Sequence, residues 1–149
     1  MKGTTILLVE DTADDEYLVK RVFTKINLIN NLFVVRDGAE ALDYLFGTGA
    51  HANRDTTQMP AVVFLDLKLP KISGLEVLRR MRADERTKFL PVVILSSSQE
   101  EQDLIQSYSL GANSYVRKPV DFTEFTEAVQ QLGFYWLLLN ELPLPKRKQ

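Results

Sequence analysis

The chain contains no cysteine and only one histidine, His51. Disulfide bonds and thiolate metal sites are therefore excluded. The histidine lies in a polar segment, where a solvated side chain is favoured over a metal ligand or a proton acceptor. No apolar run approaches the roughly 20 residues that cross a bilayer, and no signal-peptide pattern precedes the first predicted strand. We therefore expect a cytoplasmic protein without a membrane partner.

The chain also lacks an excess of charge of either sign. Its 149 residues include 18 Lys and Arg and 20 Asp and Glu, which gives a formal net charge of −2. A nearly neutral balance does not predict a nucleic-acid or membrane surface. The length suits one domain, and the hydrophobic content of 45% is normal for a globular core.

The apolar residues are concentrated in short unbroken runs, which are typical of strands buried on both faces of a sheet. Five such runs alternate with segments whose apolar residues recur at helical spacing, a pattern that indicates a parallel sheet. We predict an α/β fold, a flavodoxin-like doubly wound sheet of five parallel strands in the order 2-1-3-4-5, with helices on both faces. The predicted strands are residues 6–9, 32–35, 61–65, 91–95 and 113–117.

Polar residues before the helical segments predict where the helices begin. Thr12 is expected to cap the first helix, and Ser73 and Ser98 each stand three residues before a glutamate, as in a capping box. Residues 47–59 are polar, have no periodicity and exceed the usual connection of about 4–6 residues. We interpret them as a surface loop of tolerated length; a contact role for the loop is the alternative.

One carboxylate, Asp66, directly follows the central predicted strand. Taken alone, it could equally well cap a turn. However, the first strand ends in Glu10 and Asp11, the fourth in Ser96, and the fifth is followed by Lys118. The carboxyl ends of parallel strands meet at one edge of a sheet. The sequence therefore predicts three carboxylates, a hydroxyl and an ammonium in one crevice.

This combination of groups suits phosphoryl chemistry. Clustered carboxylates repel one another and need a cation, and oxygen ligands without His or Cys favour Mg²⁺ over transition metals. A cation, an ammonium and a hydroxyl together match the needs of a phosphoryl group. Asp66 is then the natural nucleophile and would form an aspartyl phosphate. No glycine-rich phosphate loop is present, so the donor need not be a nucleotide.

With these residues in place, the sequence resembles the receiver domain of two-component response regulators. The resemblance extends from about residue 5 to residue 132. It includes the segments 8–11, 64–70, 73–74, 95–96 and 111–119.

The resemblance implies that Asp66 accepts a phosphoryl group from a phosphohistidine on a sensor histidine kinase. It also implies that Mg²⁺ is bound by Asp11, Asp66 and the backbone carbonyl of Lys68, with Glu10 acting mostly through water. This chain has Glu10 where the family more often has Asp. The change is tolerated for a residue that binds the metal through water, as an outer-sphere ligand.

The resemblance further implies a conformational switch. Ser96 and Tyr115 occupy the switch positions, with Ser96 also binding the phosphate. Lys118 matches the lysine that pairs with the phosphate, and its bond to Pro119 is expected to be cis. Val120 stands where Phe is often found, without an evident consequence.

Within this family, the chain is most similar to the small stand-alone regulators paired with cyanobacterial phytochromes. The supporting features are residues 13–15, residues 43–46 with the long loop after them, and an aromatic C-terminal segment. The expected kinase is therefore a phytochrome.

We predict a phosphorelay protein that is not an enzyme and that signals by binding a downstream protein of unknown identity. No helix-turn-helix or enzyme domain fits the segment after the last receiver helix, and no nucleic-acid partner is expected. One alternative is a receiver-like interaction module that never accepts phosphate. A second is a phosphatase of the haloacid dehalogenase type, which usually carries an Asp where this chain has Lys68.

We expect residues 1–132 to form the receiver domain and residues 133–149 to extend its last helix. Residues 132–139 are apolar nearly all round a helix, although one apolar stripe suffices to cover a sheet. Large exposed apolar patches usually mark interfaces, so we predict a homodimer through helix four, strand five, helix five and the extension. The alternative is that the extension folds back onto its own domain. The predicted interface residues are Phe134, Tyr135, Trp136, Leu137 and Leu138.

Overall fold

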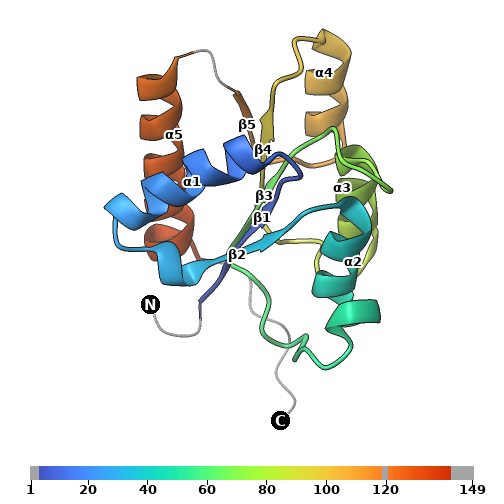
Figure 1. The fold of residues 1–149 in the computed structure, drawn as a ribbon. Helices are drawn as coiled ribbons and strands as arrows, with labels where there is room; N and C mark the ends of the chain where they lie inside the picture. Colours follow the sequence, from blue (N-terminus) through green and yellow to red (C-terminus); the bar gives the residue numbers. More distant parts are fainter. Residues whose placement is uncertain (1–3, 119–120, 142–149) are drawn as a thin grey trace.

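The computed structural model describes residues 4–118 and 121–141. Its centre is a five-stranded parallel sheet in the order β2-β1-β3-β4-β5 (Figure 1). This confirms the predicted fold class and strand order, and the strand bounds agree with the prediction to within one residue at each end. The strands are β1 (Ile6–Val9), β2 (Leu32–Val35), β3 (Val62–Leu65), β4 (Val92–Ser96) and β5 (Ser114–Arg117).

Within the described residues, five α-helices alternate with the strands. Helices α1 and α5 pack on one face of the sheet, and α2 and α3 pack on the other (Figure 1). Helix α4 contacts α3 and the edge strand β5. The helices are α1 (Ala13–Lys25), α2 (Gly38–Phe46), α3 (Gly74–Ala83), α4 (Glu101–Ser109) and α5 (Phe122–Phe134), with short 3₁₀ turns at Ile29–Asn31 and Gly49–His51.

The hydrophobic core is divided in two by the sheet. In β1, Leu7 and Val9 pack toward α2 and α3, whereas Ile6 and Leu8 pack toward α1 and α5. Side chains of a strand alternate between its faces, so a strand covered on both sides must be apolar at every position. Strands β1, β3 and β4 are buried throughout, and the edge strands β2 and β5 are partly exposed.

Two of the predicted helix caps differ from the structure. Thr12 precedes α1, but its side chain makes no capping bond; instead its backbone N–H donates to Glu10 Oε2 at 3.3 Å. Ser98 does not form a capping box, because α4 begins two residues later than that box requires. The Ser98 hydroxyl donates instead to the carboxylate of Asp103 at 2.6 Å. Ser73 caps α3 as predicted, accepting from the Glu76 N–H at 3.2 Å.

The loop at residues 47–59 is anchored to the end of α2. The Arg54 guanidinium donates to the backbone carbonyls of Leu45 at 3.2 Å and Gln58 at 2.7 Å, and lies 4.2 Å from the centre of the Tyr44 ring. The loop is therefore held by specific contacts within its own protomer.

The expectation of a solvated His51 is wrong. Its ring packs edge-on against Phe33 and Tyr44, and its Nε2 lies 3.3 Å from Glu40 Oε2. Only 17% of the His51 side chain is exposed, because these partners come from β2 and α2 rather than from the polar segment itself.

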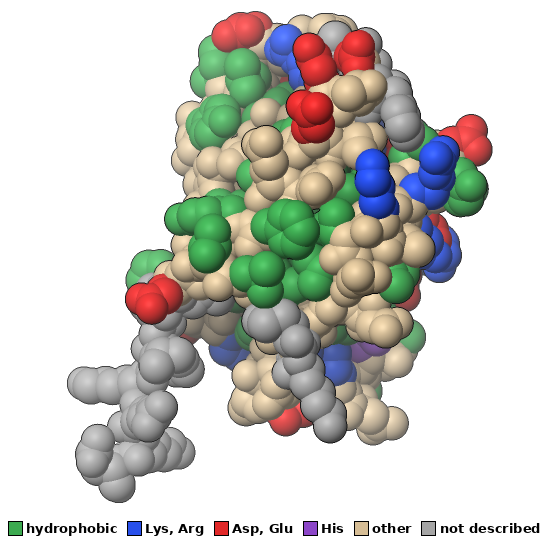
Figure 2. Space-filling view, turned by 90° about the vertical axis from the view of Figure 1, so that its left-hand side faces the viewer, with side chains coloured by type: hydrophobic (Ala, Val, Ile, Leu, Met, Phe, Trp, Pro, Cys, Tyr) green, Lys and Arg blue, Asp and Glu red, His purple; other side chains and the backbone are tan. Residues whose placement is uncertain are grey.

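Helix α5 continues without a break into a π-helical turn at Tyr135–Leu139. Leu137 is buried, and Phe134 and Trp136 pack against the same core as α1. Tyr135 and Leu138 are each 47% exposed. The first part of the extension thus folds back onto its own domain along one side, while its other side remains accessible. The side of the molecule that carries α1 and α5 shows hydrophobic side chains gathered near its centre (Figure 2).

Three further expectations are not tested. The boundary predicted at residue 132 stays a prediction, and the cis bond predicted before Pro119 lies outside the described residues, as does Val120.

In the part of the chain that the structure describes, no helix is long and apolar enough to cross a bilayer.

Candidate functional site

The predicted site residues are brought together at the carboxyl edge of the sheet. Glu10 follows β1, Asp66 follows β3, Ser96 ends β4 and Lys118 follows β5. Backbone hydrogen bonds continue the sheet past the strand ends and fix these positions. The Asp66 N–H donates to the Val9 carbonyl at 3.1 Å, and the Lys118 N–H donates to the Ser96 carbonyl at 2.8 Å.

The site is buried except on one side. Glu10, Ser96 and Lys118 are at most 5% exposed and Asp66 is 8% exposed, whereas Asp11 faces solvent. A small ligand can therefore approach from the side of Asp11. The opposite side is closed by the core of the protein.

The Lys118 ammonium is held by three carboxylates. It donates to Glu10 Oε1, to Asp15 Oδ2 at 2.8 Å and to Asp66 Oδ2 at 3.4 Å. Burial lowers the pKa of Lys118, but the hydrogen bonds to Asp15 and Glu10 outweigh this effect and the pKa lies above its usual value. Lys118 is therefore a fixed positive charge in the site.

Asp15 is the residue of this group that the sequence did not predict. An acid in the first turn of α1 is favoured by the helix dipole whether or not it belongs to a site. No local pattern distinguishes Asp15 from Asp14 and Glu16, the other two acids in the first turn of α1.

The carboxylates outnumber the ammonium. Burial raises the pKa of Glu10 from 4.5 to about 7; Lys118 lowers it in part, and the Asp66 charge adds to the rise. Glu10, Asp11 and Asp66 each offer an oxygen, and these oxygens all lie within 4.8 Å of one another. A set of oxygen donors this close, with its negative charge only partly balanced by Lys118, fits a hard divalent cation.

The turn after β3 lies against Asp66. The backbone N–H of Lys68 donates to Asp66 Oδ1 at 3.3 Å, which places this peptide beside the acidic cluster. The role of its carbonyl as a metal ligand stays a prediction. Gly74 closes the turn, and a Cβ there would lie 2.1 Å from the Asp66 carbonyl oxygen, so no larger residue fits without moving the backbone.

The predicted switch residues occupy different environments. Ser96 Oγ is buried and accepts from the Ser98 N–H at 3.1 Å, which leaves its own proton free for another acceptor. The Tyr115 hydroxyl is buried and has no hydrogen-bond partner among the described residues. Neither hydroxyl donates a hydrogen bond among the described residues, so either side chain could rotate without breaking such a bond. The conformational switch itself stays a prediction.

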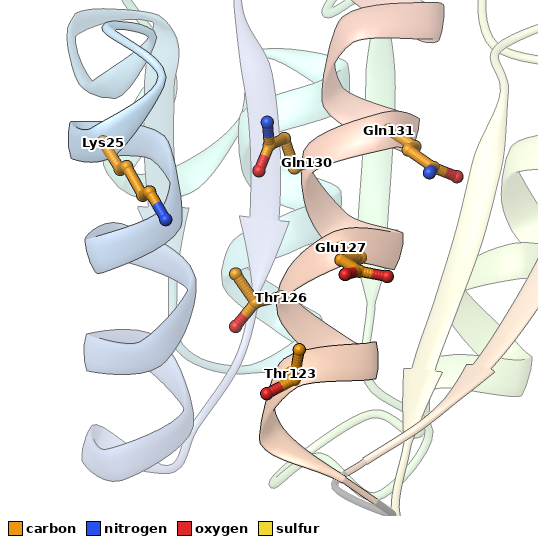
Figure 3. Close-up of a pocket in the computed structure, with 6 residues that line it drawn as sticks. All are labelled: Lys25, Thr123, Thr126, Glu127, Gln130 and Gln131. Carbon is orange, nitrogen blue, oxygen red and sulfur yellow. The ribbon is translucent and has the colours of Figure 1, made fainter.

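A separate groove of about 620 Å³ lies between α1 and α5. In Figure 3, Lys25 on α1 points toward α5, and the remaining labelled residues come from α5. None of the carboxylates around Lys118 lines this groove. The lining residues are Lys25, Thr123, Thr126, Glu127, Gln130 and Gln131.

Comparisons with known proteins identify the family. The response regulator receiver domain matches residues 6–130. The probable methanogenesis regulatory protein FilR2 of Methanothrix harundinacea is 39% identical over 140 residues, which cover 94% of this chain and 88% of FilR2. Response regulator Rcp1 of Synechocystis sp. is 36% identical over 138 residues, which cover 93% of this chain and 92% of Rcp1.

Solved structures match over almost the whole chain. The Mn²⁺-bound form of Rcp1 has a TM-score of 0.83 at 37% identity, covering 95% of this chain and 99% of Rcp1. The phosphorylated cyanobacterial phytochrome response regulator RcpA has a TM-score of 0.84 at 35% identity, with the same coverage of 95% and 99%. The bacteriophytochrome response regulator AtBRR is 52% identical with a TM-score of 0.73, covering 93% of this chain and 98% of AtBRR.

The site and the comparisons agree. Receiver domains bind Mg²⁺ or Mn²⁺ at an acidic pocket, and the carboxylates of Glu10, Asp11 and Asp66 form such a pocket here. The chain is therefore a member of the response regulator receiver family, with the stand-alone regulators of phytochromes among its close relatives.

Proposed function

We propose that this chain is a stand-alone response regulator that accepts a phosphoryl group on Asp66 from a sensor histidine kinase. Phosphorylation of an aspartate is general for the family. The observation that carries the assignment to Asp66 is the geometry of its carboxylate, which lies 3.4 Å from the Lys118 ammonium and beside the carboxylates of Glu10 and Asp11. Asp66 is the member of this cluster that directly follows the central strand β3.

The transfer uses groups that the site already contains. An oxygen of Asp66 attacks the phosphorus, the bond from phosphorus to the histidine nitrogen of the donor breaks, and the imidazole leaves with the electron pair. The Ser96 hydroxyl and the Lys118 ammonium each donate a hydrogen bond to an oxygen of the transferred group. The chain's own carboxylate is the acceptor, so the protein is a signalling component rather than an enzyme that turns over a substrate.

Glu10, Asp11, Asp66 and the carbonyl of Lys68 would hold Mg²⁺ in this site. When bound, the ion supplies positive charge against the phosphoryl oxygens and the carboxylates. The support for this role is the donor set, which contains only oxygens, and the burial of Glu10, which raises its pKa despite the hydrogen bond from Lys118.

Phosphorylation would then alter the face formed by α4 and β5. If the Ser96 hydroxyl turns toward the phosphate, the hydrogen bond from the Ser98 N–H to Ser96 Oγ at 3.1 Å changes. Ser98 is itself bonded to Asp103 in α4, so the change reaches that helix. The Tyr115 ring can move into the vacated space, because its hydroxyl holds no partner among the described residues.

The proposed kinase is a phytochrome, and the proposed location is the cytoplasm. The support for the kinase comes from the relatives: RcpA and AtBRR are both regulators of phytochromes by name, and AtBRR is 52% identical to this chain. The downstream partner is a protein whose identity neither the site nor the relatives indicate.

The test of the phosphoacceptor is labelling with acetyl phosphate and Mg²⁺, read by intact-protein mass. The wild type should gain one phosphoryl group, and Asp66→Asn should gain none. Asp14→Asn is the matched control, because Asp14 is an exposed carboxylate near the site and should label normally. Undiminished labelling of Asp66→Asn would refute the assignment. A wild type that takes no phosphate would favour a receiver-like interaction module.

We also propose a homodimer formed through α4, β5, α5 and the extension. Ile105 and Tyr108 on α4 are 51% and 50% exposed, and Tyr135 and Leu138 on the extension are each 47% exposed. Exposed apolar patches mark interaction sites, and tyrosine is among the residues enriched at the energetic centres of interfaces. Leu137, by contrast, packs in its own protomer, and we expect it to support the extension from inside.

Sedimentation tests the dimer. The wild type should be dimeric at tens of micromolar, while Tyr135→Ser with Leu138→Ser, and a chain truncated after Leu132, should be monomeric. Tyr17→Ser is the control, because Tyr17 is 62% exposed on α1 outside the proposed interface. A monomeric wild type, or a dimer unchanged by truncation, would contradict the interface.

A further inference from the structure

We propose that Asp15 is a positioning residue of the site, which holds the Lys118 ammonium so that one of its N–H groups remains directed at Asp66. The inference rests on the proposed function in one respect, namely that Lys118 binds the phosphoryl group. It assigns to Asp15 a role beyond that of an acid at the start of a helix.

The number of donors matches the number of acceptors. A lysine ammonium has three N–H groups and no acceptor. The side chain of Lys118 is 3% exposed, so water cannot readily satisfy any of them. Among the residues that the structure describes, its ion-pair partners are the carboxylates of Glu10, Asp15 and Asp66, with Asp15 at 2.8 Å and Asp66 at 3.4 Å. Each N–H group therefore has one acceptor, and Asp66 receives the longest contact.

Asp15 is separate from the cation-binding cluster. The carboxylates of Glu10, Asp11 and Asp66 lie close enough together to share a metal ion, so two of the three acceptors of Lys118 would also serve as ligands of that ion. Asp15 does not belong to this set and is 24% exposed. Asp15 is therefore the partner of Lys118 that is not also a candidate ligand of the metal ion.

The neighbours of Asp15 in the first turn of α1 have other roles. Asp14 faces solvent. Glu16 pairs with Lys20 at 2.7 Å and with Arg36 at 2.9 Å. A favourable interaction with the helix dipole would be shared by all three acids. It therefore does not account for the contact between Asp15 and Lys118.

The consequence concerns the step in which Asp66 becomes phosphorylated. The negative charge then moves outward onto the phosphoryl oxygens, and the ammonium must present a donor to them. With Asp15 and Glu10 holding two N–H groups, the third keeps its direction toward the Asp66 side. Without Asp15 the ammonium can rotate and sample several orientations, and misorientation of a group that contacts the reacting atoms slows a transfer.

The first experiment records the ¹⁵N-coupled signal of the Lys118 ammonium by NMR before any phosphodonor is added. The signal is assigned by its loss in Lys118→Arg. A buried ammonium with three fixed acceptors should exchange its protons slowly and give a resolved signal in the wild type. Asp15→Ala should remove or broaden that signal, and Asp15→Asn, which retains an acceptor oxygen, should preserve it in part. Asp14→Ala and Asp14→Asn should leave it unchanged.

The second experiment measures the rate of labelling by acetyl phosphate with Mg²⁺ at saturation. Asp15→Ala should be slower by about tenfold, Asp15→Asn should lie between it and the wild type, and both Asp14 variants should match the wild type. Thermal melts of each variant show that it is folded; Asp15→Asn keeps the assay informative if Asp15→Ala is not.

Two results would overturn the inference: a wild-type ammonium signal in Asp15→Ala, or an equal loss of signal and rate in the matched Asp14 variants. The ammonium signal is independent of phosphorylation. If the wild type were not labelled at all, the proposed function would fail while the test of Asp15 remained valid.

Discussion

Replacing Glu10 with Gln should stabilise the protein at alkaline pH when no divalent cation is present. Burial raises the pKa of Glu10 from 4.5 to about 7, with Lys118 offsetting part of the effect and Asp66 adding to it. The folded protein therefore binds a proton on Glu10 more tightly than the unfolded chain does. A rise of this size corresponds to about 3 kcal/mol. That is the cost to the folded state of a charged Glu10, relative to a neutral one.

The pH window follows from the direction of the shift. As the pH rises from 4.5 toward 7, the unfolded chain has already lost this proton and the folded protein still holds it, so stability falls. Above about 7 both states are ionised and the full cost remains. Gln has no proton to lose and still offers an acceptor to Lys118. Glu10→Gln should thus be more stable than the wild type by about 2–3 kcal/mol at pH 8, and the difference should vanish toward pH 4.5.

Urea unfolding in a chelator at pH 5, 6, 7 and 8 measures this difference. The fluorescence of Trp136, the chain's single tryptophan, reports unfolding because its ring packs against the core beside α1 and α5. Exposed Glu101→Gln is the control and should change the free energy of unfolding little at any pH. Added Mg²⁺ should stabilise the wild type more than the variant, because a ligand bound to the folded state adds stability.

Two outcomes would refute the reasoning about Glu10. One is a difference in stability that is the same at pH 5 and pH 8. The other is a variant less stable than the wild type at pH 8. In either case the buried charge would not be the dominant feature of the site without a cation.

Three further substitutions test the supporting structure. Gly74→Ala places a Cβ 2.1 Å from the carbonyl oxygen of Asp66, so it should cost about 2–4 kcal/mol in urea unfolding and slow labelling by acetyl phosphate. Arg54→Ala frees the backbone carbonyls of Leu45 at the end of α2 and of Gln58 in the loop at residues 47–59. Amide hydrogen exchange in the loop should accelerate, with a stability loss of about 1–3 kcal/mol. Ser98→Ala removes the hydroxyl bond into α4, so exchange at the start of α4 should accelerate while the labelling rate is unchanged.

The sequence alone determined the fold and the convergence of the site. Strands buried on both faces must be apolar at every position, so the unbroken runs at β1, β3 and β4 could be recognised without a structure. Parallel strands end at one edge, which is enough to bring Glu10, Asp66, Ser96 and Lys118 together. These inferences need only the order of the elements and the residue that follows each strand.

The local start of α4 was harder to predict, because it depends on competing partners. The spacing of Ser98 and Glu101 is that of a capping box. In the structure the Ser98 oxygen accepts instead from the Glu100 N–H at 3.2 Å, and its hydroxyl donates to the Asp103 carboxylate at 2.6 Å. The same limit applies to His51. Its polar sequence neighbours suggested exposure, whereas Phe33 and Tyr44 reach it from other elements.

Only the tertiary structure decided which charged groups form ion pairs and which apolar side chains are buried. Asp15 and Lys118 are 103 residues apart. No local sequence pattern predicts the contact between them or the raised pKa of Glu10. The apolar extension likewise divides into Leu137, which is buried, and Leu138, which is exposed. Burial and pairing depend on the exact separation of side chains from distant elements, whereas periodicity reports only the preferences of each element by itself.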